Sequence, residues 1–119
     1  EYDLKSVSPT LLWSYIGTKN GLADWFADDV QNEEKLFTFF WNKSSQQAHQ
    51  IAVRSGSYIR FHWLDDEDEK SFFELRISSS ELTGATMLVI TDFAYPDEMA
   101  DSRGLWDHQI ETLRRKLGV

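Results

Sequence analysis

The residues most able to do chemistry in this chain are three histidines, a run of carboxylates and one aspartate among apolar residues. His49, His62 and His108 show no paired spacing of the kind that zinc-binding helices carry. The chain has no cysteine, which excludes disulfides, thiolate nucleophiles and cysteine-type zinc sites. No serine lies in the glycine-flanked turn that exposes the nucleophile of many hydrolases. We therefore expect no catalytic residue, no metal ion and no cofactor.

The run Asp65–Glu69 carries five negative charges in a chain whose formal net charge is −8. Five carboxylates could bind a hard cation such as Ca²⁺, but the turn glycine and the closing glutamate of a calcium-binding loop are absent. The other interpretation is a solvated hairpin tip between Trp63 and Phe72, which discourages aggregation at sheet edges. We expect the solvated tip.

Asp92 falls on the same face of a predicted strand as Leu88 and Ile90. Burial of a carboxylate on an apolar face would raise its pKa, which keeps cyclase-like or hydrolytic acid–base chemistry open as an alternative. The more ordinary role of such a residue is to pair with an arginine, and Arg76 and Arg103 are the candidates. We expect that the protein is not an enzyme.

Length and charge restrict the class of partner. The chain has 119 residues, with 20 acidic and 12 basic side chains, which predicts a single domain over residues 1–119. The acidic charge disfavours nucleic acid and anionic membrane surfaces as partners. No run approaches the length of a membrane span, no signal peptide opens the chain, and the lack of cysteine fits a reducing compartment. We expect a cytoplasmic protein whose native N-terminus could precede Glu1.

Periodicity predicts the elements that hold these residues. Alternation over residues 2–7 indicates a first strand. Ser8 before Pro9 and then Thr18 are helix caps, so two short helices should follow that strand. Further strands are expected over residues 36–42, 48–54, 58–64, 72–77 and 87–93, with an edge strand over 28–32. That edge could pair two chains, so we expect a monomer or a weak dimer.

The last segment is the clearest helix, predicted over residues 103–117. Trp106, Ile110, Leu113 and Leu117 recur at intervals of four, three and four, which places them on one narrow apolar stripe. A meander of strands beside such a helix must bury both apolar faces against each other. The predicted fold class is therefore α+β: a helix-grip fold with a curved antiparallel sheet of six to seven strands around a long C-terminal helix.

Several segments resemble one known superfamily. Residues 8–13 (SPTLLW), 21–26 (GLADWF) and 87–94 (MLVITDFA), together with Trp106 and Leu113, resemble START-like domains. This superfamily includes the birch-pollen allergen, polyketide cyclases and homologues of the activator of the heat-shock chaperone ATPase. The chain is most similar to that activator branch and to compact bacterial members of unassigned function. The resemblance implies a helix-grip fold and, for the activator branch, a chaperone-associated role through an outer surface.

The candidate site is the groove between the sheet and the last helix. Its predicted lining is Phe39, Trp41, Phe61, Trp63, Phe73 and Leu75 from the sheet with Trp106, Gln109, Ile110 and Leu113 from the helix. The aromatic rings would contact a small apolar or amphipathic ligand, and Gln109 would orient its polar end. The alternative is that these side chains simply fill the core of a small protein-interaction or regulatory domain. An enclosed apolar cavity of several hundred cubic ångströms would favour the ligand.

Overall fold

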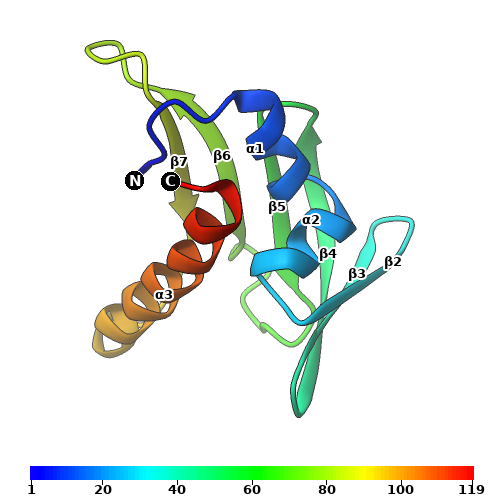
Figure 1. Cartoon of the computed structure of the whole chain (residues 1–119). Helices are drawn as coiled ribbons and strands as arrows, with labels where there is room; N and C mark the ends of the chain where they lie inside the picture. Colours follow the sequence, from blue (N-terminus) through cyan, green and yellow to red (C-terminus); the bar gives the residue numbers. More distant parts are fainter.

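A computed structural model describes all of residues 1–119 as three helices packed on one face of a seven-stranded antiparallel sheet (Figure 1). The strands are β1 (Tyr2–Asp3), β2 (Asp29–Glu33), β3 (Leu36–Trp41), β4 (Ser44–Arg54), β5 (Tyr58–Trp63), β6 (Phe73–Ser79) and β7 (Thr86–Thr91). The helices are α1 (Pro9–Ile16), α2 (Lys19–Trp25) and α3 (Met99–Leu117), with a 3₁₀ turn η1 (Pro96–Glu98) before α3. The strand order is β1-β7-β6-β5-β4-β3-β2. This architecture confirms the predicted helix-grip fold.

The two short helices form where their caps predict them. The Ser8 Oγ accepts a hydrogen bond from the Leu11 amide at 3.0 Å, and the Thr18 Oγ1 accepts one from the Gly21 amide at 3.0 Å. Gly21 also lets the two helices touch, because a Cβ at this position would lie 1.9 Å from the Ser14 carbonyl oxygen. Close packing of α1 on α2 therefore depends on the absence of a side chain at residue 21.

Alternation along β5 and β6 separates an apolar concave face from a charged convex face. Phe61 and Phe73 are buried beneath the helices, as predicted. On the convex face, Glu74 is 5% exposed and bonds Arg60 at 2.8 Å and Arg76 at 3.1 Å. Burial tends to raise the pKa of Glu74, but the hydrogen bonds from the two arginines outweigh it and the pKa is lowered. Two ion pairs thus hold the charged side chains of the convex face together.

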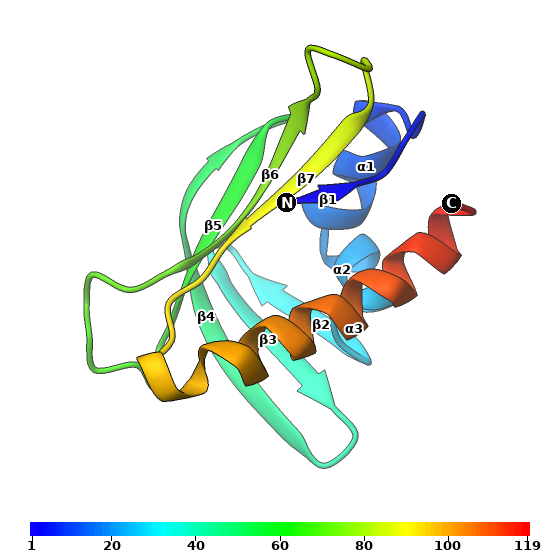
Figure 2. The ribbon, with the colours of Figure 1, turned by 90° about the vertical axis from the view of Figure 1, so that its left-hand side faces the viewer.

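Three predicted elements differ in extent from the structure by four residues: the first strand, the last helix and β4, which begins at Ser44 instead of residue 48. The first strand covers only residues 2–3, because Lys5 adopts a left-handed φ of 56° and turns the chain toward α1. The last helix begins at Met99 instead of residue 103, because Pro96 starts a 3₁₀ turn that runs directly into it. The additional turn of α3 brings the start of the helix to the same end of the molecule as the β5–β6 connection (Figure 2).

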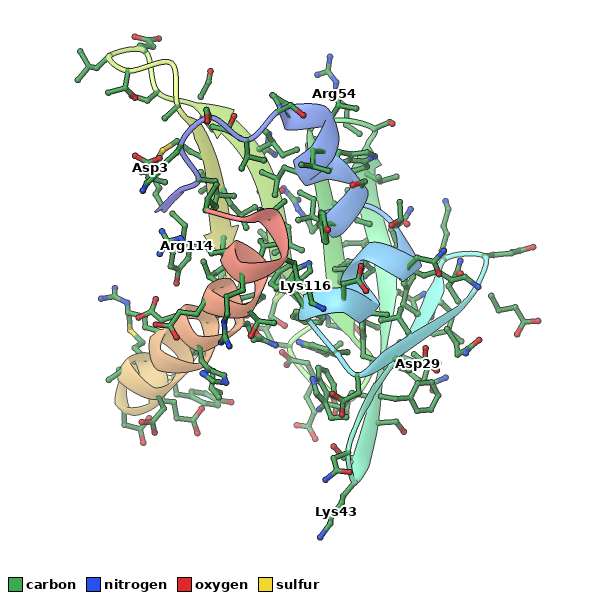
Figure 3. All side chains as sticks on the ribbon, in the orientation of Figure 1. Asp3, Asp29, Lys43, Arg54, Arg114 and Lys116 are labelled. Atoms are coloured by element: carbon green, nitrogen blue, oxygen red, sulfur yellow. The ribbon has the colours of Figure 1, made fainter.

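β1 is fastened to the last helix as well as to the sheet. The Tyr2 hydroxyl donates a hydrogen bond to Asp107, and the Arg114 guanidinium donates one to the Asp3 carbonyl oxygen at 3.2 Å. Asp3 and Arg114 lie near each other in Figure 3, whereas Lys43 extends from the tip of the β3–β4 hairpin.

The helices of the structure all lack the combination of length and apolar character that crossing a bilayer requires.

Candidate functional site

The concave face of the sheet carries a continuous layer of packed aromatic rings. Phe39 on β3, Phe61 on β5 and Phe73 on β6 are at most 1% exposed. The ring centroids of Phe39 and Phe61 are 5.6 Å apart, and those of Phe61 and Phe73 are 5.1 Å apart. Separations of this size are those of rings in direct contact. The layer leaves no room for a ligand between these three side chains.

Phe26, just after α2, fills the space between this layer and α3. Its ring centroid lies 5.1 Å from that of Phe39, 5.7 Å from that of Phe73 and 5.7 Å from that of Trp106. The groove lining predicted from the sequence did not include Phe26. The available signal was its position at the helix end, where a side chain can project away from the helix toward the sheet.

The ten predicted ligand-binding residues divide into a buried group and a partly exposed group. Six are fully buried: Phe39, Phe61, Phe73, Leu75, Ile110 and Leu113. Four keep partial exposure: Trp41, Trp63, Trp106 and Gln109. The structure brings the members of both groups to the side of the sheet that faces α3. Only the partly exposed group can touch a molecule arriving from solvent, and the buried group lies beneath it.

Two of the partly exposed residues bind the same carbonyl group. The backbone oxygen of Phe26 accepts hydrogen bonds from Trp41 Nε1 at 3.1 Å and from Gln109 Nε2 at 3.0 Å. Carbonyls at a helix end lack partners within the helix, and these two side chains supply them. No protein group donates to the side-chain oxygen of Gln109, and no buried polar side-chain atom lacks a partner. The Gln109 oxygen is therefore open to solvent as an acceptor.

Trp41 and Gln109 line a groove that runs between α2, the β3–β4 hairpin and α3. We call it the α2–α3 groove; its lining includes Trp25, Phe26, Trp41, Leu105, His108 and Gln109, and its volume is about 640 Å³. Asp24 and Asp28 stand at its rim. The groove opens to solvent and is not the enclosed cavity between sheet and helix that the sequence-based hypothesis required. It combines aromatic and aliphatic walls with one free acceptor.

Trp106 and Trp63 face other parts of the surface. Trp106 Nε1 donates a hydrogen bond to Asp92 at 2.9 Å, so the partner of Asp92 is a tryptophan rather than the predicted arginine. Arg76, one of the two candidates, is held by Glu74 instead. Partial burial of the Asp92 carboxyl group raises its pKa, although the hydrogen bonds from Trp106 and from the Phe93 amide oppose the rise.

His49 on β4 and His62 on β5 are cross-strand partners, whereas His108 lies on α3. His62 Nδ1 lies 2.9 Å from the Ser71 carbonyl oxygen, and His108 borders the α2–α3 groove. Histidine and carboxylate side chains nowhere gather into a group of three that could hold a metal ion. The side chains of the Asp65–Glu69 run are exposed in the β5–β6 connection, where Asp66 accepts a hydrogen bond from Ser71 Oγ at 2.5 Å.

A curved antiparallel sheet that grips a C-terminal helix, with a groove beside that helix, defines a helix-grip domain of the α+β class. Comparison with known families specifies it further. The model for the START-like superfamily domain matches residues 1–119, and the chain belongs to this superfamily. The resemblance found in residues 8–13, 21–26 and 87–94 is thereby confirmed.

Three solved structures illustrate the relationship. A structural-genomics protein from Bacteroides fragilis is 49% identical over 97% of this chain and 85% of that chain, with a TM-score of 0.66. The Aha1 dimer from Colwellia psychrerythraea shares 15% identity over 95% of this chain and 90% of that one, with a TM-score of 0.76. A Mesorhizobium loti protein shares 17% identity over 93% and 89% of the two chains, with a TM-score of 0.68. The last two likenesses concern the fold alone. No curated protein matches the chain.

Proposed function

We propose that this domain binds a small amphipathic molecule in the α2–α3 groove without catalysing a reaction. The observation that carries the proposal is the joining of Trp41 and Gln109 at one open groove of about 640 Å³. Pockets for small ligands usually measure between about 300 and 1,000 Å³ and combine apolar walls with few polar groups. The superfamily assignment is compatible with such a role. No hydrogen bond joins His108 to Thr112, the one hydroxyl side chain of the lining.

The chemistry of the lining indicates the type of ligand. Trp25, Trp41 and Leu105 would contact an apolar body, and the free oxygen of Gln109 would accept a hydrogen bond from a hydroxyl, amide or amine. The rim carboxylates Asp24 and Asp28 would repel an anionic head group. We therefore expect a neutral or cationic amphipathic ligand rather than a fatty carboxylate.

A neutral fluorescent dye tests this proposal. Nile red should bind saturably to the wild-type chain and lose that binding in Thr112→Trp, because Thr112 lines the groove and a larger side chain would fill it. Thr83→Trp adds the same side chain on the exposed β6–β7 turn and should leave binding unchanged. Circular dichroism of both variants controls for folding. Equal dye binding by wild type and Thr112→Trp would refute the α2–α3 groove as the site.

A second candidate is a protein-interaction or regulatory role, such as a chaperone-associated one. The filled centre, with Phe26 packed against Phe39 and Phe73, favours it because no enclosed cavity separates sheet from helix. The fold is shared with the Aha1 protein from Colwellia psychrerythraea. Co-purification from host cells with no chaperone would remove the chaperone-associated form of this candidate.

The proposal also covers the extent of the domain, its oligomeric state, its excluded partners and its location in the cell. Residues 1–119 would act as one START-like unit, as a monomer or as a weak dimer through the edge strand β2. The acidic charge supports the exclusion of nucleic acid and anionic membranes as partners. The absence of cysteine and the bacterial origin of the similar structures support a cytoplasmic location.

A further inference from the structure

A second groove lies where the β5–β6 connection meets the start of α3. Figure 2 shows both segments at the same end of the molecule. The groove has a volume of about 930 Å³, and we call it the acidic groove. Its carboxylates are Asp65, Asp66, Glu67 and Asp68 from the connection and Glu98 and Asp101 from the helix start. No lysine or arginine lines it.

The carboxylates of the acidic groove have no cationic partner within the protein. Both ion pairs of the structure join arginines to Glu74 on the convex face of the sheet. Asp65 accepts a hydrogen bond from Gln46, and Asp66 accepts bonds from Ser71 and the Asp68 amide, but these donors are neutral. Six carboxylates and no basic side chain along one groove give it a negative potential, which favours a cationic partner.

Large apolar side chains adjoin these carboxylates. Tyr95 is 75% exposed, Leu105 is 68% exposed and Phe93 is 56% exposed, and all three line the acidic groove. Single exposed apolar residues are ordinary, but several along one groove are typical of an interaction site. The sequence alone suggested a solvated tip because it did not show that the early start of α3 brings these side chains beside the acidic run.

We infer that the acidic groove docks a basic amphipathic segment of a partner protein, with lysine or arginine heads between the carboxylates and apolar side chains on Tyr95, Phe93 and Leu105. A chain segment fits better than a single small cation, since the carboxylates stand on two walls and the apolar residues lie along the groove. Such a segment offers several cations and an apolar face together. This site is distinct from the α2–α3 groove, with which it shares only Gln46 and Leu105.

The test uses a fluorescein-labelled helical peptide of about 14 residues with leucine on one face and lysine on the other. Fluorescence anisotropy with the full chain should show saturable binding that weakens as salt is added. The same peptide with glutamate in place of lysine should not bind. In the double variant Asp65→Lys/Glu67→Lys we expect the affinity to fall at least about tenfold, because two attractive contacts become repulsive.

Matched variants separate docking from general charge attraction. Glu33→Lys/Glu81→Lys changes the net charge equally at exposed positions outside the acidic groove and should leave affinity within about twofold. Tyr95→Ser should weaken the peptide, whereas Leu82→Ser, at a side chain 97% exposed on the β6–β7 turn, should not. Equal losses in the two lysine pairs would overturn the inference. The inference would also be overturned if spermine bound with the same affinity as the peptide and if Tyr95→Ser left the affinity for spermine unchanged.

The outcome is separable from that of the small-ligand proposal. Thr112→Trp should abolish Nile red binding and leave the peptide unaffected, because Thr112 lies outside the acidic groove. Loss of dye binding alone therefore tests only the α2–α3 groove, and loss of peptide binding in Asp65→Lys/Glu67→Lys tests only the acidic groove.

Discussion

At the scale of single residues, Phe26 decides what kind of site this domain can offer. Its ring lies between the aromatic layer of the sheet and Trp106 of α3, and its carbonyl oxygen holds Trp41 and Gln109. The side chain closes the interior, while the backbone group orders two residues at the surface. The filled centre is the reason why we propose the α2–α3 groove, and not the interior, as the binding site.

Truncation of Phe26 measures how completely the interior is filled. Phe26→Ala should lower the free energy of unfolding by about 3–5 kcal/mol, because the ring is 4% exposed and its removal leaves a cavity. Phe40→Ala, at a half-exposed ring on the opposite face of β3, should have a clearly smaller effect. Urea denaturation of both variants provides the comparison. Similar losses would contradict the packing role of Phe26.

Asp92 makes stability depend on pH in a defined direction. Because partial burial raises its pKa above the usual 3.8, the folded state favours the protonated form, and that contribution to stability is lost as pH rises above this value. Asp92→Asn should therefore be more stable than wild type near neutral pH, with the difference shrinking near pH 3. Urea unfolding at both pH values measures this. A difference that does not change with pH would contradict the assignment.

At the scale of elements, the caps and the helix contacts position the site. Ser8 and Thr18 start the two short helices, and Gly21 allows them to pack against each other, which places Phe26 at the end of α2 over the sheet. The α2–α3 groove thus depends on the packing of α1 on α2, which are adjacent in sequence, and on α3, which is distant from both in sequence.

Two glycines offer a matched pair of substitutions. Gly21→Ala should strongly destabilise the protein, because the new Cβ would meet the backbone of Ser14 and Tyr15. Gly104→Ala should stabilise it by about 0.5–1 kcal/mol, since nothing lies near that position of α3 and alanine favours helices. Thermal denaturation should move the two melting temperatures in opposite directions. A shift in the same direction would show that the α1–α2 contact is looser than described.

Local chemistry explains which elements the sequence could predict. The caps at Ser8 and Thr18 and the alternation of β5 are read from neighbouring residues, and both were correct. The start of α3 was placed too late, because the 3₁₀ turn at Pro96 carries no side-chain cap. The meeting of Trp41, Gln109 and Phe26 could not be predicted, since it depends on how α2 and α3 settle on the sheet.

At the scale of the whole molecule, the 119 residues fill the centre of the fold with side chains, and two grooves lie beside the last helix. One side of α3 borders the α2–α3 groove, and the start of the same helix borders the acidic groove. Membership of the START-like superfamily accounts for the architecture. The two grooves are features of this chain's own side chains, and each proposal rests on them.

The most direct test of small-molecule binding follows the tryptophan indole and glutamine amide signals by ¹H–¹⁵N NMR during titration with Nile red. We expect saturable shifts of the side-chain signals of Trp25, Trp41 and Gln109, which line the α2–α3 groove. The signals of Trp13 and Trp63 should not move, because neither side chain lines it. Absence of saturable shifts, or shifts at Trp13 or Trp63 with Trp41 and Gln109 unchanged, would contradict the account.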